Sequence, residues 1–432
     1  MELYFSQDIV LDILVRIPAK DLMRLKTVCK LWYSIITDSN FVNAHFHHSR
    51  THSQGDILLK AARHICYGLD EYVIIKKQDK NLLSIDKFDL DIPILEGRGV
   101  SVLAGCNGLL LLLGSFQHVY VCNLVTRRCT SLPPPTHPIK RIVTFALNCH
   151  WSFFYDDSIE RYKVLGIFNE YVMTLILGDT KWIKTTIPIP GNIYGYRQLT
   201  PPVLAEKELH WLAYLSVPGG EDEYGDDEQY ETVNYSCSLN VENMEFRASR
   251  VPTIRAKNYN MFLSSEIEGS VCFTTFFQDN LEIWALTDRI NYIWTRRISI
   301  DLQPLSNLRK FWLDTCTVCL KESDNNVNSD FGLKIFIHRG EKLSCYDLKS
   351  EELRQVAKIS KTLRLCRPFQ FHFNSLLSCL PSKAKGKRKR ETSAEDDRSN
   401  IVLPLTAVGE YNRPIANDYI ELRNRKIPRR CH

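Results

Sequence analysis

The chain has 432 residues, of which 44% are hydrophobic and 24% charged, an ordinary balance for a folded globular protein. No uninterrupted apolar stretch reaches the roughly 18–20 residues of a membrane-spanning helix, and the chain does not open on a signal-peptide pattern. Residues 381–432 hold thirteen Lys or Arg against seven Asp or Glu, a formal charge of +6, whereas the whole chain carries +5. The body is therefore near neutral and gives no electrostatic reason to expect nucleic-acid binding.

Residues 5–46 contain three short helical patterns. The first follows the i, i+3, i+4, i+7 spacing of one helix face, with Val10, Ile13, Leu14 and Ile17. We expect Ser6 to cap its start and Pro18 to end it. A second, shorter pattern covers residues 21–25. The apolar residues of the third are Val28, Leu31, Trp32, Ile35 and Ile36.

These helices carry more apolar surface than three helices of this size can bury among themselves. A unit of about forty residues without disulfides is marginal on its own. The surplus surface must therefore meet either the rest of the chain or another protein, and the spacing alone does not decide between them.

The same segment resembles an F-box of the plant form. The matching residues are Asp8, Ile9, Asp12, Ile13, Leu14, Arg16, Ile17, Pro18, Leu22, Leu25, Val28, Cys29, Lys30, Trp32, Ile35, Phe41 and Val42. The family usually opens on Leu-Pro, where this chain has Phe5 and Ser6. The resemblance implies docking onto the C-terminal helices of a Skp1-type adaptor. The contact residues it implies are Ile9, Leu14, Ile17, Pro18, Leu22, Leu25, Val28, Cys29 and Trp32.

From about residue 56, short apolar runs alternate with polar turns. A unit of strand, four-residue turn and strand recurs six times, 46 to 64 residues apart, starting at Tyr72, Val119, Tyr171, Tyr235, Leu281 and Leu343. Further strands are expected between these units at 109–113, 162–168, 209–213, 270–277 and 318–320. This repetition favours a β-propeller, and its irregular spacing leaves one or two β-sandwiches open. Tryptophans in these strands, such as Trp211 and Trp294, are expected in the blade cores.

Several motifs of this region resemble the plant F-box-associated domain, and the combined resemblance covers about residues 5–365. They are Gly105–Leu110, Val121–Arg127, Leu132-Pro133, Tyr155-Asp156, Arg161–Leu165, Leu209–Ala213 and Leu281–Trp284. Such domains are thought to be propeller-like and to receive the substrate. The expected organisation is an F-box at 1–50, a β domain at 56–380 and a largely disordered basic tail at 381–432.

The cysteines and histidines do not form a metal framework. Cys316 and Cys319 make the only C-x-x-C pair, and no second pair follows at zinc-site spacing. Cys106, Cys122, Cys272 and Cys345 lie in apolar runs, where a reduced cysteine behaves as a small buried apolar residue. The cluster of His45, His47 and His48 is interpreted as a solvated helix end. We expect no metal and no cofactor.

Two charged segments stand apart. Residues 218–231 combine seven acidic residues with three glycines, which predicts a disordered loop; attraction of a basic partner is the alternative. Residues 382–400 contain a basic run, Lys387, Arg388, Lys389 and Arg390. The run is either a nuclear-import signal or part of a solubilising tail.

No P-loop, nucleophile elbow, H-E-x-x-H motif or RING-type Cys/His array occurs, so we expect a non-catalytic protein. The prediction is a substrate receptor of a Skp1–cullin–F-box ubiquitin ligase, in the nucleus or cytoplasm, that binds an unidentified protein target and neither nucleic acid nor membrane. The alternative is a scaffold or competitor with a weakened F-box, supported by Phe5-Ser6. An enzyme using a propeller channel ranks third.

Overall fold

The computed structural model describes 6–52 and, with gaps, 56–379. The described ranges of the second part are 56–63, 71–79, 82–88, 101–114, 118–134, 150–168, 171–187, 202–218, 230–251, 260–267, 270–277, 280–301, 316–321, 333–339, 342–347, 350–358, 363–372 and 374–379. In these ranges, no helix combines the length and apolar character needed to cross a membrane.

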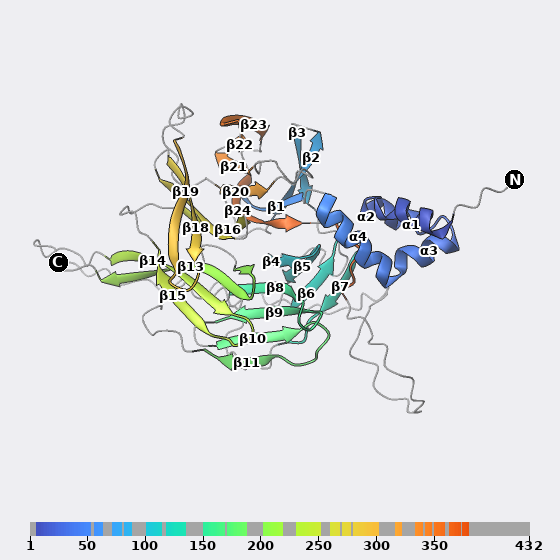
Figure 1. Ribbon diagram of the computed structural model, residues 1–432, viewed down its shortest axis with the longest axis horizontal. Helices are drawn as coiled ribbons and strands as arrows, with labels where there is room; N and C mark the ends of the chain where they lie inside the picture. The colour runs from blue at the N-terminus through green and yellow to red at the C-terminus, as the bar shows by residue number, and fades with distance from the viewer. Residues whose placement is uncertain are drawn as a thin grey trace, which may run out of the picture. The chain divides into compact units, whose positions relative to one another are not determined.

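Residues 6–52 form four helices, which we call the helical unit (Figure 1): α1 (Gln7–Val15), α2 (Ala19–Leu25), α3 (Lys30–Thr37) and α4 (Ser39–His52). Ser6 caps α1 as predicted, its hydroxyl oxygen accepting from the Ile9 N–H at 3.4 Å. The sequence predicted three helices and missed α4, whose polar composition hides its periodicity. Asp38 precedes α4 and accepts from the N–H groups of Asn40 and Phe41 at 2.9 and 3.2 Å.

The histidine cluster lies inside α4, so the interpretation of a solvated helix end is wrong for His45. Its side chain is 1% exposed, and its Nε2 lies 2.9 Å from the Ile17 carbonyl oxygen. Burial lowers the His45 pKa, and the hydrogen bond to that carbonyl opposes this effect. The nearby positive charge of His48 lowers the pKa further, to a smaller extent. His45 therefore ties α4 to the chain between α1 and α2.

The described strands form six four-stranded antiparallel sheets, which confirms the predicted β-propeller and excludes the sandwich alternative. In chain order the strands are β1 (Asp56–Arg63), β2 (Glu71–Asp79), β3 (Leu82–Phe88), β4 (Ser101–Cys106), β5 (Leu109–Leu113), β6 (Val119–Asn123), β7 (Arg128–Ser131), β8 (His150–Asp156), β9 (Arg161–Ile167), β10 (Tyr171–Ile176), β11 (Ile183–Thr186), β12 (Val203–Ala205), β13 (Glu208–Pro218), β14 (Tyr230–Asn240), β15 (Phe246–Arg250), β16 (Asn260–Ile267), β17 (Ser270–Phe277), β18 (Asn280–Asp288), β19 (Ile293–Asp301), β20 (Cys316–Lys321), β21 (Leu333–Arg339), β22 (Lys342–Asp347), β23 (Glu352–Lys358) and β24 (Leu363–His372).

Five sheets follow chain order, and the sixth has the order β24-β1-β2-β3. The first strand of one sheet contacts the first strand of a neighbour in the pairs β4 with β8, β12 with β16, β16 with β20, β20 with β24, and β24 with β4. These first strands therefore surround the centre. Pairing of β24 with β1 places the two ends of the domain in one sheet and closes the ring, and each sheet keeps one outer edge strand.

The six repeats predicted from the sequence correspond to the third and fourth strands of the six sheets. Four of the six turns share one local chemistry, in which an Asn or Asp ends the third strand and its side chain accepts backbone N–H groups two or three residues later. This residue is Asn123, Asn240, Asp288 or Asp347. The turn ends in a left-handed residue with φ of 52° to 58°, namely Arg127, Met244, Tyr292 or Glu351. The recurrence in the sequence is thus a recurrence of turn geometry.

Neighbouring sheets bury apolar clusters between them. Trp211, 1% exposed, packs with Phe154 and Leu239, and Trp294, 6% exposed, packs with Phe273. The tryptophans thus lie in the blade cores, as predicted.

Two sequence interpretations change. Cys122 and Cys129 are direct cross-strand neighbours in β6 and β7, with Cα atoms 4.2 Å apart, and form a disulfide. The expectation of a reduced Cys122 is therefore corrected. In the acidic segment, Pro218 pairs with Tyr230 and Val217 with Glu231, so the ends of that segment belong to β13 and β14. Its interior, 219–229, lies outside the described residues.

Candidate functional site

The interior of the helical unit is apolar and well filled. Leu14, Leu22 and Ile36 are 0% exposed, and they pack with Ala19, Ile35 and Phe41. Leu14 and Leu22 were predicted as adaptor contacts, but in the chain alone neither presents surface to a partner. Both lie in the core, where they hold the helices in position, and their contact with an adaptor stays a prediction.

Three other predicted contact residues, Ile17, Leu25 and Trp32, are partly buried against this core. Such residues present one edge outward while the rest of the side chain is fixed by packing. The Trp32 N–H at the start of α3 lies 3.5 Å from Cys29 Sγ, which caps the helix. Trp32 is therefore held both by its backbone and by its ring.

The outward surface of the helical unit carries large apolar side chains. Five are 48–60% exposed: Ile9 (48%), Ile13 (51%), Val28 (60%), Leu31 (50%) and Tyr33 (57%). Pro18 and Cys29, which were also predicted as contacts, are exposed. So many exposed large apolar residues on one small unit indicate a surface that binds another protein. Contact of any predicted residue with an adaptor stays a prediction.

Local structure explains how these residues reach the surface. Ile9 and Ile13 lie four positions apart in α1, on one helical face, whereas Leu14 follows inward. Val28 precedes α3 and lies outside the third helix in which the sequence pattern placed it.

Charged side chains accompany the apolar ones. Arg16 and Asp12 form an ion pair at 2.9 Å with both side chains about two-thirds exposed, and Arg24 lies 3.6 Å from Asp21. Exposed pairs of this kind add little stability and keep the surface soluble. The surface thus combines apolar anchors with charged neighbours, as protein-binding surfaces do.

Sequence reasoning missed Ile13, Leu31 and Tyr33 as surface residues. Ile13 and Leu31 were recognised as apolar members of the helical patterns, but their spacing did not show which way they face. It also missed Leu376, which lies far along the chain and is buried in the core of the helical unit. No local signal marks that residue. The predicted nuclear-import run, 387–390, lies outside the described residues.

Comparison with known proteins agrees with this architecture. The F-box domain model matches residues 4–43. The F-box protein CPR1 of Arabidopsis thaliana is 32% identical over 438 residues, which cover 92% of this chain and 95% of that protein. This chain therefore belongs to the plant F-box protein family.

Two further Arabidopsis thaliana proteins match over shorter stretches. F-box protein At5g18160 is 27% identical, covering 70% of this chain and 72% of that protein. Putative F-box protein At3g52320 is 34% identical over 166 residues, 38% of this chain and 40% of that protein. Among solved structures, a quinonprotein alcohol dehydrogenase-like protein from Bacteroides thetaiotaomicron matches with TM-score 0.37 and 9% identity over 75% of this chain and 79% of that chain. At that TM-score the likeness carries no argument, and the propeller rests on the strand order.

Proposed function

We propose that this chain is the substrate receptor of a Skp1–cullin–F-box ubiquitin ligase. The helical unit binds a Skp1-type adaptor, and the propeller binds a protein target. The receptor performs no bond chemistry; it raises the effective concentration of target lysines beside the ubiquitin-conjugating enzyme held elsewhere in the complex.

The observation that carries this proposal is the exposed apolar surface on the F-box helices. Ile9, Ile13, Val28, Leu31 and Tyr33 are all about half exposed or more. Burying such side chains in a partner's groove is favourable, at roughly 25 cal/mol for each Å² of apolar surface removed from water. Membership of the F-box family supports a Skp1-type adaptor as that partner.

The test is purification of tagged full-length protein from plant cells, followed by identification of the co-purified subunits. The wild type should bring down both a Skp1-type adaptor and a cullin. Val28→Asp places a charge on the proposed interface and should lose both. Ile183→Asp is the matched control, because Ile183 is also 60% exposed but lies on β11 of the propeller. Equal recovery of adaptor with Val28→Asp and Ile183→Asp would contradict the proposal.

The same experiment separates the alternative function. Recovery of the adaptor without a cullin would favour a scaffold or competitor. Recovery of both, with ubiquitin transfer in the purified complex, supports a ligase receptor.

A further inference from the structure

A short segment after the last strand links the propeller to the F-box helices. Residues 374–379, which we call the clasp segment, follow β24, the strand that closes the ring. Leu376 within it is 6% exposed and belongs to the same buried cluster as Leu14, Leu22 and Ile36 of the helical unit. A residue that follows the last propeller strand in the sequence thus completes the core of the F-box helices.

The clasp segment is held to the sheet β4–β7 by buried hydrogen bonds. Asn123, at the end of β6, is 0% exposed, and its Nδ2 donates to the carbonyl oxygens of Ser375 at 3.0 Å and Leu377 at 2.8 Å. Its Oδ1 accepts from the N–H groups of Val125 and Thr126 at 2.8 and 3.0 Å. Both donor hydrogens and the acceptor of this amide are used, as a buried Asn requires.

Two further contacts extend the attachment. Ser375 Oγ, on a residue 1% exposed, donates to the Asn107 carbonyl oxygen at 2.8 Å in the turn between β4 and β5. Cys379, also 1% exposed, packs in the sheet's own core and accepts from Thr130 Oγ1 at 3.5 Å.

The turn between β6 and β7 also reaches the helices directly. Val125 packs, partly buried, against the same cluster that contains Leu376. Lys26, at the end of α2, has its pKa lowered by burial and by the nearby positive charge of Arg128 in β7. Side chains of the helical unit and of the sheet β4–β7 therefore contribute to this contact, in addition to the clasp segment.

We propose that the clasp segment fixes the orientation of the F-box helices on the propeller, with Asn123 and Leu376 as positioning residues. This rests on the proposed function: a target on the propeller is held at a fixed distance from the ligase only if propeller and F-box form one rigid body. A loose connection would spread the target's lysines over a larger volume and lower their effective concentration.

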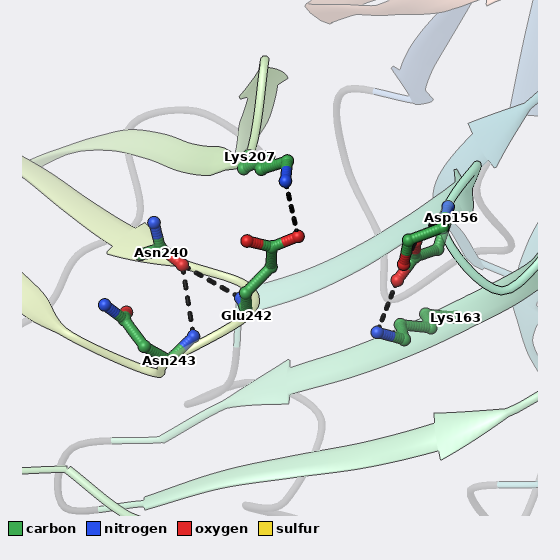
Figure 2. Close-up of polar contacts among 7 residues, drawn as sticks. Asp156, Lys163, Lys207, Asn240, Glu242 and Asn243 are labelled. Carbon is green, nitrogen blue, oxygen red and sulfur yellow. Dashed lines mark hydrogen bonds and ion pairs between the residues drawn. The ribbon is translucent and has the colours of Figure 1, made fainter.

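Matched variants isolate the clasp. Asn240 ends β14 and accepts from the N–H groups of Glu242 and Asn243 at 2.9 and 3.1 Å, the same turn chemistry that Asn123 provides (Figure 2). Asn123→Ala and Asn240→Ala both remove a turn acceptor, but only Asn123→Ala also removes the two donations to the clasp segment. Leu376→Ala and Leu377→Ala form a second pair, since only Leu376 belongs to the helical core.

The first readout is hydrogen exchange of the α1–α3 amides in the full-length chain. Leu376→Ala should raise their exchange rates by about tenfold or more, because truncating a buried Leu removes core packing. Asn123→Ala should raise them, and both controls should leave them near wild type. Equal exchange in Asn123→Ala and Asn240→Ala would overturn the coupling.

The second readout separates positioning from mere stability. With saturating Skp1-type adaptor, the F-box helices are held folded, and a fluorophore pair at the exposed positions Asn43 and Glu242 reports their distance to the propeller. Leu376→Ala should broaden that distance distribution; a distribution as narrow as the wild type's overturns the proposal. If Leu376→Ala does not fold, Ser375→Ala, which removes only the donation to Asn107, takes its place under the same criterion. Failure of the wild type to bind adaptor contradicts the proposed function instead, and the exchange experiment still tests the clasp.

Discussion

The helical unit and the propeller use apolar residues in opposite ways. The propeller sheets from β4 to β19 bury apolar clusters between neighbours, and the described propeller residues expose few large apolar side chains, namely Ile183 and Ile293 on strands and Ile159 and Ile290 in turns. The far smaller helical unit exposes five and takes Leu376 from outside itself to fill its core. A closed ring buries apolar surface between its own sheets, whereas the four short helices take Leu376 and Val125 from the propeller and still leave apolar surface exposed. This exposed apolar surface is the feature on which the proposed adaptor binding rests.

Leu14 and Ile13 are neighbours in α1 that differ in exposure. Leu14→Ala, at 0% exposure, should lower the free energy of unfolding by about 2–5 kcal/mol through lost burial and a residual cavity. Ile13→Ala, at 51% exposure, should change it by about 0.5 kcal/mol or less while weakening adaptor binding. Urea unfolding and a binding assay on both variants check this. Similar stabilities would show that the structure assigns the wrong residue to the core.

Two buried histidines of the propeller should make its stability fall in acid. Burial lowers the pKa of His150 to about 4, and burial together with the nearby Arg289 lowers the pKa of His210 to about 4. Both folded-state values lie below the unfolded value of about 6.5, so their contribution is complete above that pH and is lost as pH falls toward 4. Each histidine should cost on the order of 2 kcal/mol between pH 7 and 5.

Unfolding measured at pH 7 and pH 5 tests this expectation. His210→Gln should reduce the pH dependence relative to the wild type, because one of the titrating groups is gone. An unchanged pH dependence in that variant would show that His210 does not contribute to the loss of stability in acid.

Two ion pairs of the propeller differ in exposure (Figure 2). Lys163 and Asp156 lie 2.5 Å apart with side chains only 16% and 10% exposed, whereas Lys207 and Glu242 lie 2.7 Å apart at 64% and 46%. Burial raises the Asp156 pKa, but the hydrogen bonds from Lys163 and Ser158 outweigh it and bring the pKa to about 2. Lys163→Ala should therefore cost about 2 kcal/mol, the usual range for a hydrogen bond to a charged group.

Lys207→Ala is the exposed counterpart and should leave the unfolding midpoint unchanged, because solvent screens that pair. Thermal unfolding of the two variants in parallel decides the matter. Equal effects would mean that burial does not distinguish these pairs.

The smallest effect on the folded regions is expected from the tail. Replacing 387–390 by alanine should leave unfolding of both regions unchanged and reduce the nuclear fraction of a fluorescent fusion, if the basic run is an import signal. Imaging beside a variant with the four basic residues 423, 425, 426 and 429 replaced controls for loss of positive charge alone. Unchanged nuclear signal would leave a solubilising tail as the better interpretation.

The sequence predicted the propeller because its repeats are local. An Asn or Asp that ends a strand, followed by a left-handed residue such as Arg127 or Met244, is a short-range signal that a single chain displays. The innermost strands gave weaker signals, because the connections before them have no fixed length. The number of blades therefore came from the strand order alone.

The exposure of the apolar residues of the helical unit was predicted only in part, for a physical reason. An apolar stripe shows that residues share a helical face but not whether that face looks inward or outward. Leu14 and Leu22 were assigned to the surface and lie in the core, whereas Ile13 and Leu31 were passed over and lie outside. The contribution of Leu376 depends on ring closure, which no local pattern reveals.

We propose that the exposed apolar residues of the helical unit bind a Skp1-type adaptor. Calorimetric titration of purified full-length protein with a plant Skp1-type adaptor measures this directly. We expect Leu31→Ala combined with Val28→Ala to weaken the affinity for the adaptor by about tenfold or more. This is a hot-spot effect of at least about 1.4 kcal/mol. Ile290→Ala, at 83% exposure on the propeller, should bind like the wild type. Unchanged affinity in the double variant, or no binding by the wild type, would contradict the account.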